Sequence, residues 1–174
     1  MDERQVAAAV ERIVRSMTEN HSCHSSEPHV CRCGKKKMTL KKAQRLAAAV
    51  EAEAKKMGVS AVIAVSDQGG NPVLVHSMDN AYLASWDIAY QKAYTVVALK
   101  MSTEKLAELA APGGSLYGIQ FTNNGKIVIF GGGEPLQYED KIVGGLGVSG
   151  GTAEQDTALA AFGKEKFKEI NESC

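Results

Sequence analysis

The residues best suited to binding a metal ion are gathered in a short polar stretch near the N-terminus. Residues 18–37 hold three of the four histidines and three of the four cysteines of the chain. Thiolate and imidazole are ligands that Zn²⁺ prefers, and four of them would complete a tetrahedral site. The spacing matches no standard zinc finger, because it has one CxC and no CxxC pair, so structural zinc, adventitious metal binding and no metal binding all stay open. The candidate metal ligands are Cys23, His24, His29, Cys31 and Cys33, with His21 beside them.

A second stretch that could do chemistry is GLGVSG, Gly145–Gly150, which matches the dinucleotide fingerprint GxGxxG. In that fingerprint a strand and a helix flank the glycines, and a second parallel strand must follow. Here the chain after the helix is the polar stretch GKEKFKEINESC, so the second strand is missing. We therefore expect Gly144, Gly145 and Gly147 to lie in a strand, where the missing side chains let another backbone, a helix or a flat ligand approach closely.

The rest of the chain offers no paired nucleophile and base. From Met38 onward there is one histidine, His76, and no cysteine before Cys174. A serine in this region has only that imidazole as a partner, so acyl-transfer and thiol chemistry are not expected. The residue types favour a protein that is not an enzyme.

Composition sets the broad class of the protein. The chain has 174 residues, of which 44% are hydrophobic, enough for one globular domain. Its 20 acidic and 20 basic residues give a formal net charge of zero, which argues against a nucleic-acid partner. No stretch approaches the roughly 20 apolar residues that span a bilayer, and the N-terminus MDERQVAAAVERIV carries charges where a signal peptide needs an apolar centre. We expect a cytoplasmic protein with no membrane partner and with reduced thiols.

The chain divides into three segments. Residues 1–17 predict an amphipathic helix, which is too short to be stable alone and needs a partner surface. That surface is either the chain's own domain or a groove on another protein. Residues 18–37 predict a flexible Cys/His-rich linker, and residues 38–174 a compact domain. The apolar face of the short helix consists of Val6, Val10, Ile13, Val14 and Met17.

Start and stop signals place the first elements of the compact domain. TLKKAQRLAAAVEAEAKKMG predicts a helix with Thr39 as its N-cap and Gly58 just past its end. The runs SAVIAVS and NPVLVHSM, joined by DQGG, predict a β-hairpin with Asp67 as a turn residue that binds backbone donors. A long helix is expected over Tyr82–Lys100, and a shorter one from about Ser102. The buried stripe of the first helix is expected to be Leu40, Ala43, Leu46, Ala47 and Val50.

The second half of the domain repeats this mixture of strands and helices. GIQFT and KIVIFGG bracket the turn NNG and predict a second hairpin, and KIVGGLGVSG predicts the final strand. The last helix opens with Thr152 and Gln155 at capping-box spacing. The resulting order α, β, β, α, α, β, β, β, α contains two hairpins, which predicts an α+β domain with a largely antiparallel sheet.

Four stretches of this domain together resemble a known family. AVSDQGGNPV, MDNAYLASWDIAYQKAYT, FGGGEPL and IVGGLGVSGGTAEQD follow one another in the order found in the GlcG/HbpS/PduO C-terminal family of haem-binding domains, over about residues 39–170. The resemblance implies a profilin-like sandwich, with an antiparallel sheet of about five strands and helices packed on it. It also implies a homo-oligomer and a haem-related accessory role. Some members form the tail domain of a cobalamin adenosyltransferase.

The N-terminal helix resembles the encapsulation peptides of bacterial microcompartment cargo. Those peptides are short amphipathic helices joined to a core domain by a flexible linker. The resemblance implies a location in the microcompartment lumen, with residues 4–17 contacting shell or cargo proteins.

The family resemblance also suggests cofactor-binding residues, with two departures from its pattern. The first predicted helix has no histidine to serve as an axial haem ligand, and Ser77 stands where members commonly have Arg. The candidate ligands are then His76 and Met78, which strand alternation puts on the same face. Lys92, in the KA pair of YQKAYT, either pairs with a propionate or other anion in a cleft or extends to solvent. His76 could equally be a structural residue.

The leading hypothesis is a non-enzymatic haem- or tetrapyrrole-binding accessory protein that is cargo of a bacterial microcompartment. One alternative is an accessory component of cobalamin metabolism. Another is a metal or redox site on the N-terminal Cys/His segment, for zinc or another metal, tethered to a structural oligomer.

Overall fold

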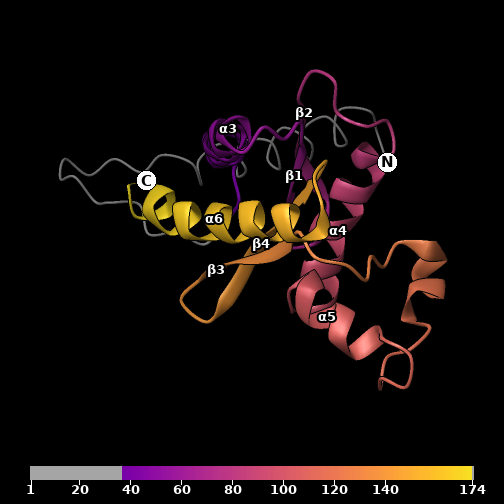
Figure 1. Ribbon diagram of the computed structural model, residues 1–174. Coiled ribbons are helices and arrows are strands. Elements are labelled where there is room, and N and C mark those ends of the chain that lie inside the picture. Colours follow the sequence, from indigo (N-terminus) through magenta and orange to yellow (C-terminus); the bar gives the residue numbers. More distant parts are fainter. Residues whose placement is uncertain (1–36, 174) are drawn as a thin grey trace, which may run out of the picture. The chain divides into compact units, whose positions relative to one another are not determined.

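The computed structural model describes residues 37–173, which belong to one compact unit (Figure 1). The predicted amphipathic helix of residues 1–17 and the candidate metal ligands in residues 18–37 lie outside the described residues. Within the described part of the chain, no helix is both long and apolar enough to cross a membrane.

The first described helix, α3, spans Leu40–Lys56 and begins where the sequence predicts. The Thr39 hydroxyl accepts a hydrogen bond from the backbone N–H of Lys42 at 3.3 Å, and Gly58 follows the helix end with φ of 68°. The expected buried stripe is confirmed except at its first residue, because Leu40 is 53% exposed. Side chains on a helix point toward its N-terminus, and Leu40 is the first residue of α3. Its side chain therefore extends past the end of the helix and does not pack on the core. Met38 lies buried there instead.

Four antiparallel strands form the sheet, in the order β2-β1-β4-β3. β1 (Val62–Asp67) and β2 (Pro72–Ser77) are the predicted first hairpin, and β4 (Lys141–Ser149) is the predicted final strand. The α+β fold with an antiparallel sheet is confirmed. Among residues 37–173 the sheet has four strands, however, where about five were expected.

The missing strand comes from the predicted second hairpin, which is wrong. The stretch around NNG forms two short 3₁₀ helices, η1 (Ile119–Phe121) and η2 (Asn123–Gly125), and the apolar run after it is not a strand. Ile127 and Val128 in this run are buried, but the backbone binds a helix side chain: the N–H of Val128 donates to Thr95 Oγ1 at 3.1 Å. The real second hairpin joins β3 (Gly133–Tyr138) to β4.

Helices cover both faces of the sheet. α3 and α6 (Ala153–Glu172) lie side by side on one face, where most of the hydrophobic core is found (Figure 1). α4 (Ser85–Leu99) packs on the other face, mainly against β4 and β1. α5 (Thr103–Ala110) follows α4, and the segment between α5 and β3 loops out beside it in Figure 1.

Helix caps set where the later elements begin. The Ser102 hydroxyl accepts from the backbone N–H of Lys105 at the start of α5. At the start of α6, Thr152 and Gln155 form the predicted capping box, with hydrogen bonds in both directions. These local signals fix the orientation of the residues that follow them.

The glycines of GLGVSG allow α4 to pack directly on β4. A Cβ atom on Gly147 would lie 2.0 Å from the carbonyl oxygen of Ala89, and one on Gly145 would lie 2.2 Å from that of Ala93. No side chain fits in that space, so the glycines bring helix and strand backbones into contact. This confirms the strand interpretation of the motif.

Candidate functional site

A buried ion pair joins α4 to the start of α6. Lys92 is fully buried, and its ammonium donates to Asp156 Oδ2 at 2.9 Å and to the carbonyl oxygen of Val148 at 2.7 Å. The same nitrogen lies 4.9 Å from the centroid of the Phe130 ring. Burial lowers the pKa of Lys92, and the Asp156 carboxylate opposes that shift. The ammonium thus has partners inside the protein and does not extend to solvent.

Asp156 has a second partner in the turn that precedes α6. Its Oδ1 accepts from the backbone N–H of Gly151 at 2.9 Å, so both carboxylate oxygens are hydrogen-bonded. The backbone of Gly132, with φ of 109°, lies directly against the pair. A Cβ atom there would lie 2.6 Å from Lys92 Nζ. Gly132, the second glycine of FGGG, therefore leaves room for the lysine.

A cavity of about 280 Å³ lies next to this ion pair. Three of the four stretches that carry the family resemblance contribute to its walls: MDNAYLASW, FGGG and GVSGGTAEQD. These stretches are far apart in the sequence, and the Lys92–Asp156 pair helps to hold them together. The side chains in its walls include Tyr82, Ser85, Ile88, Phe130, Ser149 and Asp156.

Two buried hydroxyl groups form the polar part of this cavity. Ser85 and Ser149 are each 4% exposed, and the two oxygens lie 3.2 Å apart in a hydrogen bond. Ser85 is the first residue of α4 and Ser149 the last residue of β4. The close packing of α4 on β4 brings these ends together.

His76 lies in a different place, on the edge strand β2. Its Nε2 is 2.9 Å from Glu51 Oε2 on α3, and its side chain is 38% exposed. Glu51 also pairs with Lys55, whose hydrogen bond is the main cause of the lowered pKa of Glu51; the charge of His76 contributes in the same direction. The imidazole is therefore accessible from solvent while one of its nitrogens contacts a carboxylate.

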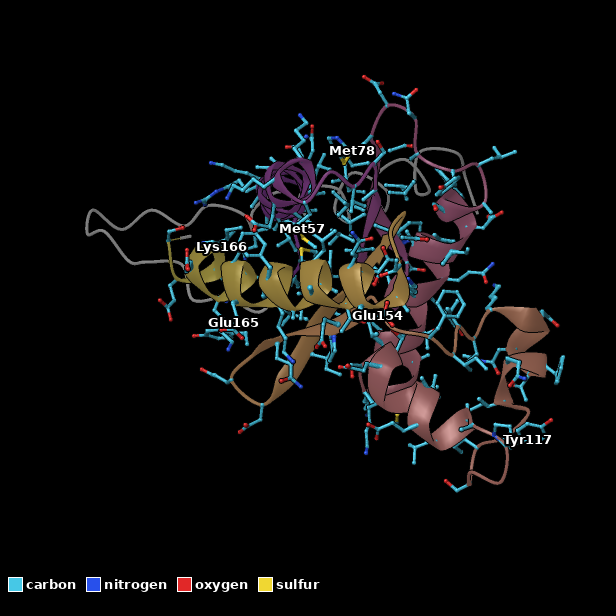
Figure 2. The ribbon with its side chains drawn as sticks, in the orientation of Figure 1. Met57, Met78, Tyr117, Glu154, Glu165 and Lys166 are labelled. Carbon is cyan, nitrogen blue, oxygen red and sulfur yellow. The ribbon has the colours of Figure 1, made fainter. Side chains whose placement is uncertain are left out.

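Met78, just past β2, packs against the core on the α3 side of the sheet (Figure 2). Its sulfur accepts a hydrogen bond from the backbone N–H of Ala61 at 3.3 Å. His76 and Met78 thus lie on one side of the sheet, whereas Lys92 belongs to α4 on the other. The structure does not bring the three predicted cofactor-binding residues into one site.

Sequence reasoning found some polar residues of the domain and missed others. Asp67 is the expected turn residue, because its Oδ1 accepts from the backbone N–H groups of Gly69 at 2.8 Å and Asn71 at 2.9 Å. Burial acts to raise the pKa of Asp67, but these hydrogen bonds outweigh it and hold the pKa below its usual value. The serine pair and the partner of Lys92 were missed, because no local pattern links positions 64 residues apart.

Among residues 37–173, no group of three or more His, Cys, Asp or Glu side chains is placed to hold a metal ion. The predicted metal ligands all precede this part of the chain. Metal binding by the N-terminal segment stays a prediction.

The fold and the glycine-lined contact between α4 and β4 define the class of protein: an α+β domain with one antiparallel sheet between helices. Comparison with known proteins gives the family. Residues 38–165 match the family described as "Haem degrading protein HbpS-like". The chain belongs to this HbpS-like family.

Two relatives show how far the similarity extends. The chain is 46% identical over 133 residues to an uncharacterized 15.0 kDa protein of the dhaT-dhaS intergenic region of Citrobacter freundii, covering 76% of this chain and 94% of that protein. It is 33% identical over 155 residues to the corrinoid adenosyltransferase PduO of Salmonella typhimurium. That match covers 86% of this chain but 46% of PduO, so more than half of that enzyme has no counterpart in the alignment.

Solved structures share the fold. Klebsiella pneumoniae protein ORFY is 40% identical with a TM-score of 0.74, and the match covers 84% of this chain and 98% of ORFY. A PduOC:heme complex is 34% identical with a TM-score of 0.71, covering 74% and 94%. A double mutant of HbpS from Streptomyces reticuli is 27% identical with a TM-score of 0.69, covering 82% and 98%.

Proposed function

We propose that this chain is a non-enzymatic accessory protein that binds haem or a related tetrapyrrole. The observation that carries the proposal is the similarity to the PduOC:heme complex, which spans 94% of that chain at 34% identity. The match to a family described by haem degradation points to the same ligand class. Both similarities concern the domain that starts at about Met38.

Of the three predicted cofactor-binding residues, His76 fits a haem best. Its side chain is 38% exposed, and imidazole is a common axial ligand of haem iron. The sulfur of Met78 already accepts a hydrogen bond from a backbone N–H, and the ammonium of Lys92 is buried with Asp156, so both groups already have partners within the protein. His76 would hold the iron. Glu51 would either keep its contact with Nε2 and orient the imidazole, or give up that contact so that Nε2 can bind the iron.

A haemin titration of the full-length protein tests the proposal. We expect a shifted Soret band that saturates at one haem per chain or at a simple fraction of that ratio. His76→Ala should weaken binding at least about tenfold, which corresponds to 1.4 kcal/mol, whereas Ser77→Ala, an exposed neighbour on β2, should bind as the wild type does. Absence of a saturable shift would overturn the proposal.

The same sample distinguishes an accessory protein from a haem-degrading enzyme. The assay uses ascorbate as the reductant with oxygen present. If the protein only binds haem, the Soret band should decay no faster than it does with a non-specific haem carrier such as albumin. Faster loss of the band in the presence of the protein would show degradation. The non-enzymatic part of the proposal would then be wrong.

We further propose that the protein is a homo-oligomer and cargo of a bacterial microcompartment. Large apolar side chains at the surface support self-association, since Leu83 is 95% exposed, Phe121 83% and Tyr82 73%. The cargo role rests on the sequence of residues 4–17. Fusing residues 1–37 to a fluorescent protein should direct it into purified microcompartments, and Val10→Glu together with Val14→Glu should abolish this by breaking the apolar face.

A role in cobalamin metabolism is the second candidate, favoured by the similarity to PduO. The chain spans less than half of that enzyme, so adenosyl transfer is not expected of this chain alone. An assay of adenosyl transfer to cob(I)alamin separates the two candidates. A metal or redox role of the Cys/His segment is tested by metal analysis of the full chain and of a variant in which the six residues are replaced.

A further inference from the structure

We propose that the cavity between the start of α4, the end of β4 and the start of α6 binds a small uncharged molecule. The ligand would have a flat apolar body and one hydroxyl or carbonyl oxygen. This proposal does not rest on haem binding, because the cavity is separate from His76, the residue assigned to the iron.

The size and walls of the cavity set the apolar part of the ligand. Its volume of about 280 Å³ is just below the range of about 300 to 1,000 Å³ that is usual for small-molecule sites, so the ligand must be small. Tyr82 and Phe130 contribute aromatic rings, exposed by 73% and 43%, and Ile88 adds an aliphatic wall. Aromatic walls of this kind suit a small ring, which would stack or pack edge-on against them.

The serine pair supplies the polar part. The two hydroxyl groups of Ser85 and Ser149 carry two hydrogens, and the hydrogen bond between them uses one. Neither hydroxyl forms another hydrogen bond with the residues that the structure describes. One donor is therefore free in side chains that are 96% buried and that line the cavity, and a ligand oxygen would satisfy it.

The charges around the cavity favour an uncharged ligand. Asp156 lies in the wall, but its two oxygens already accept from Lys92 and from the backbone N–H of Gly151. Because Lys92 already compensates the charge of Asp156, neither an anion nor a cation would gain a counter-charge here to offset the cost of leaving water. A neutral hydroxyl or carbonyl group avoids that cost.

The test uses two probes of similar shape, benzyl alcohol and toluene, of which only the first has an oxygen. Each is titrated into the full-length protein while the backbone amide resonances of Ser149, Gly150 and Gly151 are followed by NMR. We expect both probes to shift these resonances, and benzyl alcohol to bind about three- to tenfold more tightly, as a single hydrogen bond allows.

Three variants connect the result to the cavity. Ser85→Ala should remove most of the preference for benzyl alcohol over toluene, and Tyr82→Ala should weaken the binding of both probes. Tyr82 is mostly exposed, so its truncation keeps the test valid if the buried serine variant does not fold. The matched control Ser77→Ala should leave both affinities unchanged.

Two outcomes would overturn the proposal. In the first, the three amides do not respond, or Ser85→Ala and Tyr82→Ala bind both probes as the wild type does. In the second, the same amides respond to protein dilution and not to the probes, which would mean that a second copy of the chain covers the cavity. Loss of haem binding would change neither result.

Discussion

The ion pair between Lys92 and Asp156 shows why single residues matter in this domain. Both groups are almost completely buried, and each has further hydrogen bonds, to Val148 and Gly151. A buried charge that loses its partner is costly, because neither water nor another ion compensates it. The pair therefore fixes the position of α6 relative to α4.

Replacing both members of the pair should cost less than the sum of the two single replacements. We expect Asp156→Asn to lower the free energy of unfolding by about 3–5 kcal/mol, because it leaves the Lys92 ammonium uncompensated. The double variant Lys92→Met with Asp156→Asn should be more stable than the sum of the two single effects by about 1–3 kcal/mol. Urea denaturation of the four proteins measures this coupling, and simple additivity would contradict the account.

Asp67 gives a prediction about pH. Its pKa in the folded state lies below the ordinary value of 3.8 because backbone N–H groups bind the ionised form. The folded state therefore favours the carboxylate, so this stabilisation is present above about pH 3.8 and is lost as the pH falls through the lower, folded-state pKa.

The matched variant for Asp67 is Asp67→Asn, which keeps an acceptor oxygen but has no charge. At neutral pH it should be less stable than the wild type by about 1 kcal/mol, since hydrogen bonds to charged groups exceed those to neutral ones by about that amount. The difference should shrink toward zero as the pH falls below the folded-state pKa of Asp67. A difference that is constant with pH in denaturation experiments would exclude this origin.

Among the elements, the packing of α4 on β4 depends on the glycines of GLGVSG. A methyl group on Gly147 would meet the carbonyl oxygen of Ala89 at 2.0 Å, which is backbone and cannot turn away. Gly147→Ala should therefore cost about 3 kcal/mol or more, as severe overpacking does. Gly58→Ala is the control, because a Cβ there meets nothing within 4 Å and costs only the left-handed backbone strain of about 1–2 kcal/mol. Equal losses in a denaturation experiment would mean that the close contact is not important.

Elements with a local signal could be predicted from the sequence, and elements with tertiary partners could not. The caps Thr39, Ser102 and Thr152 and the turn DQGG act within a few residues, so α3, α5, α6 and the first hairpin were located correctly. The NNG stretch has the composition of a hairpin turn, but the chain after it is held by Thr95, a residue on α4. The site was predicted least well for the same reason: Lys92 was singled out, but Asp156 as its partner was not.

For the whole molecule, an exposed apolar side chain gives a test of the proposed homo-oligomer. Leu83 is 95% exposed at the start of the α4 region, so in an isolated chain its replacement by Asp should not affect stability. In a homo-oligomer that uses this surface, Leu83→Asp should reduce the assembly toward the 18.5 kDa monomer. Light scattering coupled to size exclusion measures this. A wild-type protein that already runs as a monomer would contradict the proposed oligomer.

We propose that the HbpS-like domain, and not the N-terminal Cys/His segment, carries the haem site. The most direct measurement is a haemin titration of the full chain in which the cysteines and histidines of residues 18–37 are replaced by serine and alanine. We expect the same saturable Soret shift and stoichiometry as for the wild type. Loss of the shift in this variant, with binding retained in His76→Ala, would contradict it.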